Sequence, residues 1–218
     1  GSPCSRICIS EKATSNNDCC GFFRSTRSLV QKGVITIIKY RKSILRVDGN
    51  DFKSIGRMAN EPIWGVWAGL FGLANTEVIA ITLAESENVE PWAKQIQVLD
   101  EQLLMATARP LSNNAPSQKG LYVFRSMETE SKNIDEIVEL SAHAWKTFET
   151  SDNYRSEPIG LFRPENPGEI STMWLLTWYD GFESWQRSRE PHDDARAAFT
   201  KRHSLLRRTN AIATRLVT

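Results

Sequence analysis

The chain has 218 residues, of which 24 % are charged and 40 % are apolar, as in ordinary globular proteins. Its 27 basic and 26 acidic residues leave a net charge of +1, which argues against a nucleic-acid partner or an anionic membrane surface. No apolar run reaches the roughly 18–20 residues that a membrane-spanning helix needs. The composition therefore predicts neither a nucleic-acid-binding nor a membrane protein, and it names no function.

All four cysteines lie near the amino end, as Cys4, Cys8, Cys19 and Cys20. Zinc sites use two separated cysteine pairs, and two adjacent cysteines make a poor second pair, so no metal site is predicted. The same segment is polar and lacks the apolar stretch of a secretory signal. We therefore expect residues 1–32 to be a flexible extension with free thiols, in a cytoplasmic protein.

The next part of the chain shows strand-like runs of β-branched residues and helix-like spacings. Asn75-Thr76 marks a tight turn between two strands, and Pro91 suits the first turn of a helix. The predicted order is strand 34–40, a short amphipathic helical piece with Phe52, Ile55 and Met58 that Pro62 ends, strands 64–73 and 77–83, and helix 90–107.

A polar segment rich in Ser, Asn and Pro, residues 112–119, reads as a linker. After it the same order of elements recurs. The predicted elements are strand 121–125, helix 133–150, strands 158–163 and 171–179, a helical region over 182–208, and strand 211–217. Strand 171–179 is apolar at both alternating sets of positions, which predicts that both of its faces are covered.

The sequences before and after segment 112–119 also share a short identical motif. Gly69-Leu70-Phe71 matches Gly160-Leu161-Phe162, and a tryptophan follows each copy at a similar distance, Trp92 in the first and Trp185 in the second. A fixed order with repeated anchors predicts an internal duplication.

Each predicted copy has the β-α-β-β-α-β order of a ferredoxin-like module, whose sheet leaves one face bare. Two modules can bury their bare faces against each other. We therefore predict an α+β protein in which modules 33–111 and 120–218, joined by linker 112–119, pack sheet to sheet as a fused α/β barrel.

The stretch 174–192, WLLTWYDGFESWQRSREPH, resembles the dimeric α/β barrel superfamily, which includes NIPSNAP-type proteins and antibiotic-biosynthesis-type monooxygenases. In such barrels a strand ends in a short acidic turn, followed by a helix with spaced aromatic residues. The resemblance implies the fold. It leaves several activities open, because the superfamily includes cofactor-free oxygenases, haem-binding and haem-degrading enzymes, decarboxylases and dehydratases.

Three histidines are candidates for proton transfer. Helical spacing puts His143 opposite an apolar stripe, which predicts a surface position. His192 falls on the same side as Ala195 and Phe199, and His203 lies near that side. A neutral His192 at a helix start would suit a general base or a metal ligand; the alternative is a packed or surface histidine.

The second part is also rich in aromatic residues. We predict a pocket for a flat apolar ligand, with Arg125 as the anchor of a ligand carboxylate; the alternative is an ordinary core. The predicted substrate-binding residues are Trp145, Trp174, Trp178, Tyr179 and Trp185.

These residues predict an enzyme that acts on a small apolar or aromatic molecule, as a cofactor-independent oxygenase with His192 and Arg125 as catalytic residues. One alternative is a haem-binding protein with His192 as the axial ligand. Another is a non-catalytic assembly or binding module. The chain is predicted to be a monomer or a homodimer. It contains no dinucleotide-binding, Walker, zinc-protease or serine-hydrolase motif.

Overall fold

The computed structural model describes residues 38–47, 51–84 and 89–217. The extension predicted at 1–32, with its four cysteines, and most of the strand predicted at 34–40 lie outside the described residues. The elements are β1 (Lys39–Arg46), η1 (Phe52–Met58), β2 (Ile63–Phe71), β3 (Glu77–Ala84), β4 (Gln97–Arg109), β5 (Leu121–Glu130), η2 (Ser131–Asn133), α1 (Ile134–Phe148), β6 (Ser156–Pro164), β7 (Ile170–Tyr179), α2 (Phe182–Arg187), α3 (Asp193–Ser204) and β8 (Leu206–Leu216). In this described part, no helix is long and apolar enough to span a bilayer.

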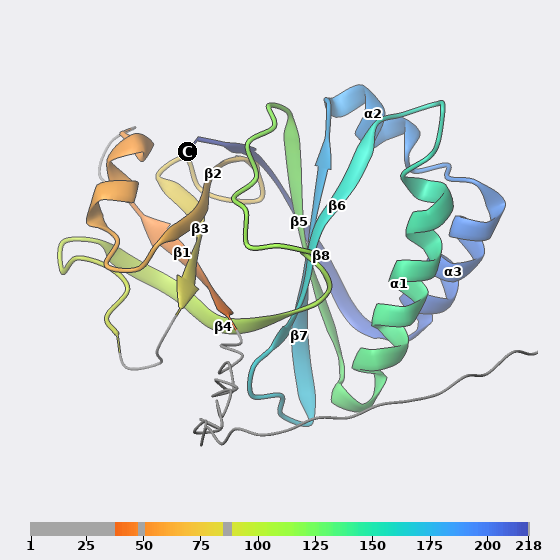
Figure 1. Ribbon diagram of the computed structural model, residues 1–218, viewed down its shortest axis with the longest axis horizontal. Coiled ribbons are helices and arrows are strands. Elements are labelled where there is room, and N and C mark those ends of the chain that lie inside the picture. The colour runs from red at the N-terminus through yellow and green to blue at the C-terminus, as the bar shows by residue number, and fades with distance from the viewer. Residues whose placement is uncertain (1–37, 48–50, 85–88, 218) are drawn as a thin grey trace, which may run out of the picture. The chain divides into compact units, whose positions relative to one another are not determined.

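The eight strands form one closed barrel in the order β1-β3-β2-β8-β5-β7-β6-β4. Every neighbouring pair is antiparallel, and β4 returns to pair with β1, so each strand has two partners. A closed ring leaves no strand edge open to pair with another chain. Helices α1 and α3 pack against each other beside β5 and β7 (Figure 1).

The second half follows the predicted ferredoxin-like order, with β5, α1, β6, β7, the α2–α3 region and β8 in sequence. The first half contains four strands and the 3-10 helix η1, and its described residues include no α-helix. The helix predicted over 90–107 is wrong, because residues 97–109 form strand β4. Strand β4 pairs with both β1 and β6, and these hydrogen bonds override the helix propensity of its Gln, Glu, Leu, Met and Ala residues.

The two halves do share one local structure. Gly65 on β2 and Gly160 on β6 each follow a register shift against the next strand. At each of them an added Cβ would lie 2.3 Å from an aromatic ring two residues on, that of Trp67 or Phe162. The glycines therefore make room for rings that fold back over the strand.

The letter match at 69–71 and 160–162 is not a structural match. Phe71 is 68 % exposed at the end of β2, whereas Phe162 is 1 % exposed inside the barrel. The ring that follows Gly65 at the spacing at which Phe162 follows Gly160 is that of Trp67. The internal duplication stays a prediction, and Gly69-Leu70-Phe71 gives it no structural support.

The barrel interior is filled by aromatic side chains. On β7, Trp174 and Trp178 point inward, whereas Leu175 and Tyr179 pack on the opposite face with the helices. Because side chains alternate along a strand, β7 contributes to two cores at once. This confirms that both faces of the strand are covered. The inward-facing aromatic residues are Tyr40, Trp64, Trp67, Tyr122, Phe124, Phe162, Trp174 and Trp178.

The segment 112–119 contains neither helix nor strand, and it runs across the polar tips of four barrel aromatics. The aromatic side chains donate and the segment accepts, three times through a main-chain oxygen, so the segment satisfies donors that burial would otherwise leave unpaired. The bonds run from Tyr40 Oη to Asn113 Oδ1 (2.8 Å), Trp64 Nε1 to Asn114 O (3.0 Å), Tyr122 Oη to Gln118 O (2.8 Å) and Trp178 Nε1 to Lys119 O (3.1 Å).

A buried ion pair lies on the first half. The guanidinium of Arg41 donates to Glu61 at 3.1 Å through both Nε and Nη2, and its Nη1 donates to Glu101 at 2.9 Å. The side chain of Glu61 is 4 % exposed and that of Glu101 is 29 % exposed. Thr82 also donates its hydroxyl proton to Glu61. Such a pair is tolerated in a protein interior because hydrogen bonds satisfy both charges.

Candidate functional site

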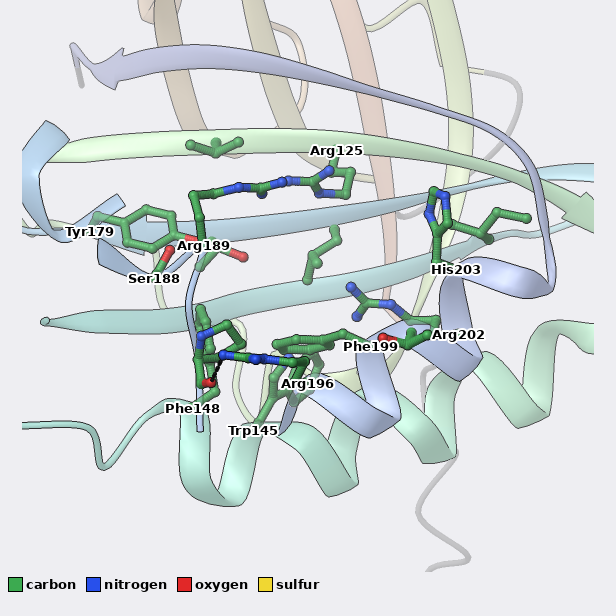
Figure 2. Close-up of a pocket in the computed structure, with 16 residues that line it drawn as sticks. Arg125, Trp145, Phe148, Tyr179, Ser188, Arg189, Arg196, Phe199, Arg202 and His203 are labelled. Carbon is green, nitrogen blue, oxygen red and sulfur yellow. Dashed lines mark hydrogen bonds between the residues drawn. The ribbon is translucent and has the colours of Figure 1, made fainter. Parts of the chain in front are cut away.

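A cavity of about 330 Å³ lies between the outward face of β5 and β7 and the helices α1 and α3 (Figure 2). The segment between α2 and α3 closes part of its wall. The lining residues are Val123, Arg125, Trp145, Phe148, Leu175, Thr177, Tyr179, Ser188, Arg189, Pro191, Arg196, Phe199, Thr200, Arg202, His203 and Leu206. A concave site of this size, with apolar walls and a few polar groups, is typical of small-molecule binding.

The two strands form one side of the cavity through alternate residues. Val123 and Arg125 come from β5, and Leu175, Thr177 and Tyr179 come from β7. In the register of the pair, Arg125 lies opposite Leu175. The strand period therefore places a cationic side chain among apolar neighbours on the outward face.

The helices supply the aromatic walls. Trp145 and Phe148 come from the buried face of α1, and Phe148 meets Phe199 of α3 edge to face at 5.4 Å between ring centroids. Arg202 lies 4.7 Å from the centroid of the Phe199 ring. Its Nη1 also donates to the Ser141 hydroxyl of α1 at 2.9 Å. These contacts fix the position of the Arg202 guanidinium.

The cavity is strongly basic. Four arginines line it, namely Arg125, Arg189, Arg196 and Arg202, and within the described residues no Asp or Glu does. In the same part of the chain, the side chains of Arg125 and Arg189 have neither a hydrogen-bond nor an ion-pair partner, whereas Arg196 approaches the exposed Asp193 at 3.9 Å. Arginines arranged in this way create a positive potential that favours an anion.

The arginines and Tyr179 interact electrostatically. Burial lowers the pKa of Arg125, and the charge of Arg189 lowers it further. Burial, with the charge of Arg125, lowers the pKa of Arg202 to about 10. Burial raises the pKa of Tyr179, and a hydrogen bond with Ser188 and the nearby arginines oppose that change. Arg125 is thus close enough to Arg189 for its charged form to be disfavoured by that residue, and Arg202 is close enough to Arg125.

Of the seven predicted site residues, three line this cavity. Arg125 and Tyr179 extend from the strands and Trp145 extends from α1 (Figure 2). Trp174 and Trp178 do not reach it, because their positions on β7 face the barrel interior. There Trp174 Nε1 donates to Gln102 Oε1 at 2.8 Å.

Two predicted residues of the α2–α3 region also lie away from the cavity. Trp185 lies on α2 and packs against the core that includes α1 and α3 residues, without lining the cavity. His192 has a side chain that is 63 % exposed, and it lies in a separate surface depression beside Glu190 and Asp193. The expectation that His192 faces inward with Phe199 is therefore wrong.

The physical reason is that His192 is not part of the helix. Its backbone is extended, with φ −51° and ψ 148°, and α3 begins at Asp193. Its Nδ1 accepts the backbone N–H of Asp194 at 3.3 Å, which makes His192 the N-cap. Helical phase therefore does not extend back to it. The histidine that lines the cavity is His203, which is also exposed to solvent, and His143 is exposed on α1 as predicted.

Sequence reasoning missed Arg189, Arg196, Arg202 and His203 as cavity residues. A signal was present for part of this set, because Arg196, Phe199 and His203 follow the i, i+3, i+7 spacing of one helix face. No comparable pattern links Arg189 to Arg125 in the sequence. In the described part of the chain, no group of three or more His, Cys, Asp and Glu residues could hold a metal ion.

No family model matches the chain, and no curated protein matches it in sequence. Solved structures match it in fold. An anthrone oxidase-like protein aligns with a TM-score of 0.55 at 10 % identity, and the alignment covers 84 % of this chain and 92 % of the other chain. A candidate monooxygenase of Fusobacterium nucleatum aligns with a TM-score of 0.52 at 7 % identity, covering 84 % and 94 %. An uncharacterised ferredoxin-fold protein of Listeria monocytogenes, related to antibiotic biosynthesis monooxygenases, aligns with a TM-score of 0.51 at 6 % identity, covering 86 % and 99 %.

At these identities the likeness establishes the fold alone. The chain has a ferredoxin-like α+β fold, which confirms the predicted fold class, and membership of the predicted superfamily stays a prediction. The NIPSNAP-type resemblance and the tandem arrangement stay predictions.

Proposed function

We propose that the cavity beside β5 and β7 binds a small molecule with an aromatic or apolar body and oxidises it with molecular oxygen, without a cofactor. The observation that carries this proposal is a cavity with walls of Trp145, Phe148 and Phe199 and with arginines around it. The fold supports it, since structural neighbours are named as monooxygenases or as an anthrone oxidase-like protein. The carbon that reacts would lie among the aromatic rings.

The chemistry requires a substrate with an acidic C–H bond. A base removes one proton, and the carbanion passes electrons to dioxygen and forms a hydroperoxide with it. Loss of water then leaves a carbonyl, so that CH₂ and O₂ give C=O and H₂O, with four electrons moving from carbon to oxygen. Arginines near the developing negative charge stabilise it, and apolar walls exclude water.

In this proposal, His203 takes the role of the base, because it is the histidine that lines the cavity. The sequence assigned that role to His192, which lies in the depression on the surface. Arg125 keeps its predicted part as the group that binds the substrate anion. Tyr179 and Trp145 keep theirs as substrate contacts.

Oxygen uptake with an anthrone as substrate tests the proposal. We expect uptake with formation of the corresponding quinone, a large loss of turnover in His203→Gln, and normal turnover in the matched surface variant His143→Gln. Turnover lost in His192→Gln and retained in His203→Gln would overturn the assignment of the base. Binding of the anthrone without any oxygen uptake would favour a non-catalytic binding module.

A second candidate function is haem binding, favoured by arginines that could pair with the two propionate carboxylates and by an imidazole in the same cavity. His203 would hold the iron, in place of the predicted His192. Haem added to the protein should then give a shifted Soret band that is lost in His203→Ala and kept in His192→Ala. An unshifted band in the wild-type protein would exclude this function.

We also propose that residues 33–111 and 120–218 are tandem ferredoxin-like modules, joined at 112–119. The matching bulges and ring contacts at Gly65 and Gly160 support this proposal. A cytoplasmic location and a monomeric or homodimeric state stay predictions.

A further inference from the structure

We propose that the ligand of this cavity is an organic acid, with its ionised carboxylate held by Arg125, Arg189 and Arg202 and its apolar body held by the aromatic walls. This inference deepens the proposed function and rests on the same cavity. It concerns the class of ligand that binds, whether or not oxygen then reacts with it.

The first argument is the convergence of positive charge from three separate elements. Arg125 comes from β5, Arg189 from the segment after α2, and Arg202 from α3. Figure 2 shows Arg125 and Arg189 on the strand side of the cavity and Arg202 on the helix side. The charge of Arg189 lowers the pKa of Arg125, and the charge of Arg125 lowers that of Arg202, so these neighbouring cations carry an electrostatic cost in the folded chain.

The second argument is the lack of compensation. Buried or partly buried charges in proteins are normally paired with an opposite charge. Arg125 is only partly exposed, yet in the part of the chain that the structure describes it has no carboxylate partner. A carboxylate from a ligand would supply that partner and would relieve the mutual repulsion of the arginines.

The third argument is preorganisation. Arg202 is held by Ser141 and by the ring of Phe199, and Arg125 extends from the middle of a strand that is paired on both sides. Guanidinium forks held in place bind carboxylates through two parallel hydrogen bonds. Arg189 and Arg196 are exposed, so we expect them to contribute less to affinity.

The walls decide what the acid is attached to. Trp145, Phe148, Leu175 and Phe199 offer apolar and aromatic surface on the side of the cavity away from solvent. A small inorganic anion or a sugar phosphate would leave this surface without a partner. A compact aromatic carboxylate satisfies both the charge and the walls.

The test compares 2-naphthoate with its neutral amide, 2-naphthamide, by isothermal titration calorimetry on the full chain. Charge-assisted hydrogen bonds are stronger than neutral ones, so we expect the acid to bind at least about tenfold more tightly than the amide. Arg125→Gln and Arg202→Gln should each remove most of this difference. Arg215→Gln, which removes an exposed arginine of β8 outside the cavity, is the matched control and should retain it.

Arg125→Lys distinguishes loss of the charge from a folding defect. It keeps the positive charge but lacks the planar guanidinium, so it should retain part of the preference for the acid. Equal binding of acid and amide by a folded wild-type protein would overturn the inference, and so would an unchanged preference in both glutamine variants. Naphthoate has no oxidisable CH₂ group. Its binding is therefore independent of oxygen chemistry, and a failure of the oxygenase proposal is seen separately in the anthrone assay.

Discussion

Arg202 of α3 and Ser141 of α1 are joined by a hydrogen bond of 2.9 Å, with the arginine as donor. Ser141 is completely buried, and its own proton goes to the carbonyl of Ile137 at 2.7 Å. Its hydroxyl oxygen is therefore free to accept. The bond ties the two helices together at the wall of the cavity and holds the guanidinium before any ligand arrives.

Removing this hydroxyl should weaken ligand binding more than it weakens the fold. We expect Ser141→Ala to lower the affinity for 2-naphthoate about threefold to tenfold, because Arg202 loses its anchor, and to reduce the free energy of unfolding by about 1 kcal/mol. Calorimetry and urea unfolding measure the two effects. Ser204→Ala removes an exposed hydroxyl from the end of the same α3 helix and should change neither. An unchanged affinity in Ser141→Ala would show that the anchor is unimportant.

Gly120 occupies a position that no other residue can fill without strain. Its φ is +149°, and an added Cβ would lie 2.2 Å from the carbonyl oxygen of Tyr179 and 2.6 Å from Trp178 Nε1. Because backbone must move, we expect Gly120→Ala to lower the free energy of unfolding by about 3 kcal/mol or more. At Gly181 nothing lies within 4 Å of an added Cβ, so Gly181→Ala should change the midpoint of thermal unfolding little. Similar midpoints for the two variants would contradict this.

The two carboxylates that hold Arg41 should differ in their effect on stability. Glu61→Gln leaves a buried guanidinium short of its main counter-charge, so we expect a loss of about 3 kcal/mol in urea unfolding. Glu101 is more exposed, and Glu101→Gln should lower stability by about 1 kcal/mol or less. The reverse order would mean that the more exposed carboxylate carries the pair.

Alkaline pH should unfold the protein through its buried tyrosines. Burial raises the pKa of Tyr40 to about 12, and burial with the charge of Glu157 raises that of Tyr122 to about 12. Unfolded tyrosines lose their protons near pH 10. Between these values the folded chain binds more protons than the unfolded chain, so stability that is complete below pH 10 falls as pH rises towards 12.

Arg202 acts in the opposite direction, because its pKa is lowered to about 10 and the unfolded chain binds the extra proton above that pH. Burial also lowers the pKa values of Lys42 and Arg125, which act in the same direction as Arg202, and raises those of Tyr154 and Tyr179. Four tyrosines thus oppose three cationic groups, and we expect the tyrosines to set the net direction. Phenolate absorbance near 295 nm and circular dichroism, followed from pH 9 to 12, should therefore change together. Tyr40→Phe removes one of the titrating phenols and should shift the midpoint of alkaline unfolding to higher pH. Phenolate absorbance that grows while the native dichroism persists would contradict this prediction.

The order of the second half could be predicted from its sequence because its patterns are local. In β7, large residues at both alternating sets of positions indicate that both faces of the strand are covered. In α1, the apolar stripe of Ile134, Ile137 and Trp145 indicates which side of the helix is buried. Periodicity of this kind needs no knowledge of distant partners. Such elements lie close to their predicted bounds.

The wrong predictions concern residues whose structure depends on partners far away in the sequence. Strand β4 is extended because β1 and β6 pair with it from either side. His192 leaves the helical phase because α2 ends at Arg187 and α3 begins one residue after the histidine. The cavity arginines come from three elements, and only the packing of α3 over β5 brings Arg125 and Arg202 together. Local pattern could not predict these features.

The segment 112–119 also shows which changes the barrel can absorb. Three of its four acceptors, at Asn114, Gln118 and Lys119, are main-chain oxygens, which any amino acid supplies. Replacement of its side chains other than Asn113, whose Oδ1 accepts from Tyr40, should therefore have little effect on stability. A deletion of one residue, in contrast, would pull the main-chain oxygens away from Trp64 and Trp178. We therefore expect the length of this connection to vary much less among related proteins than its amino-acid sequence does. Sequence differences within it would not indicate a change in the barrel.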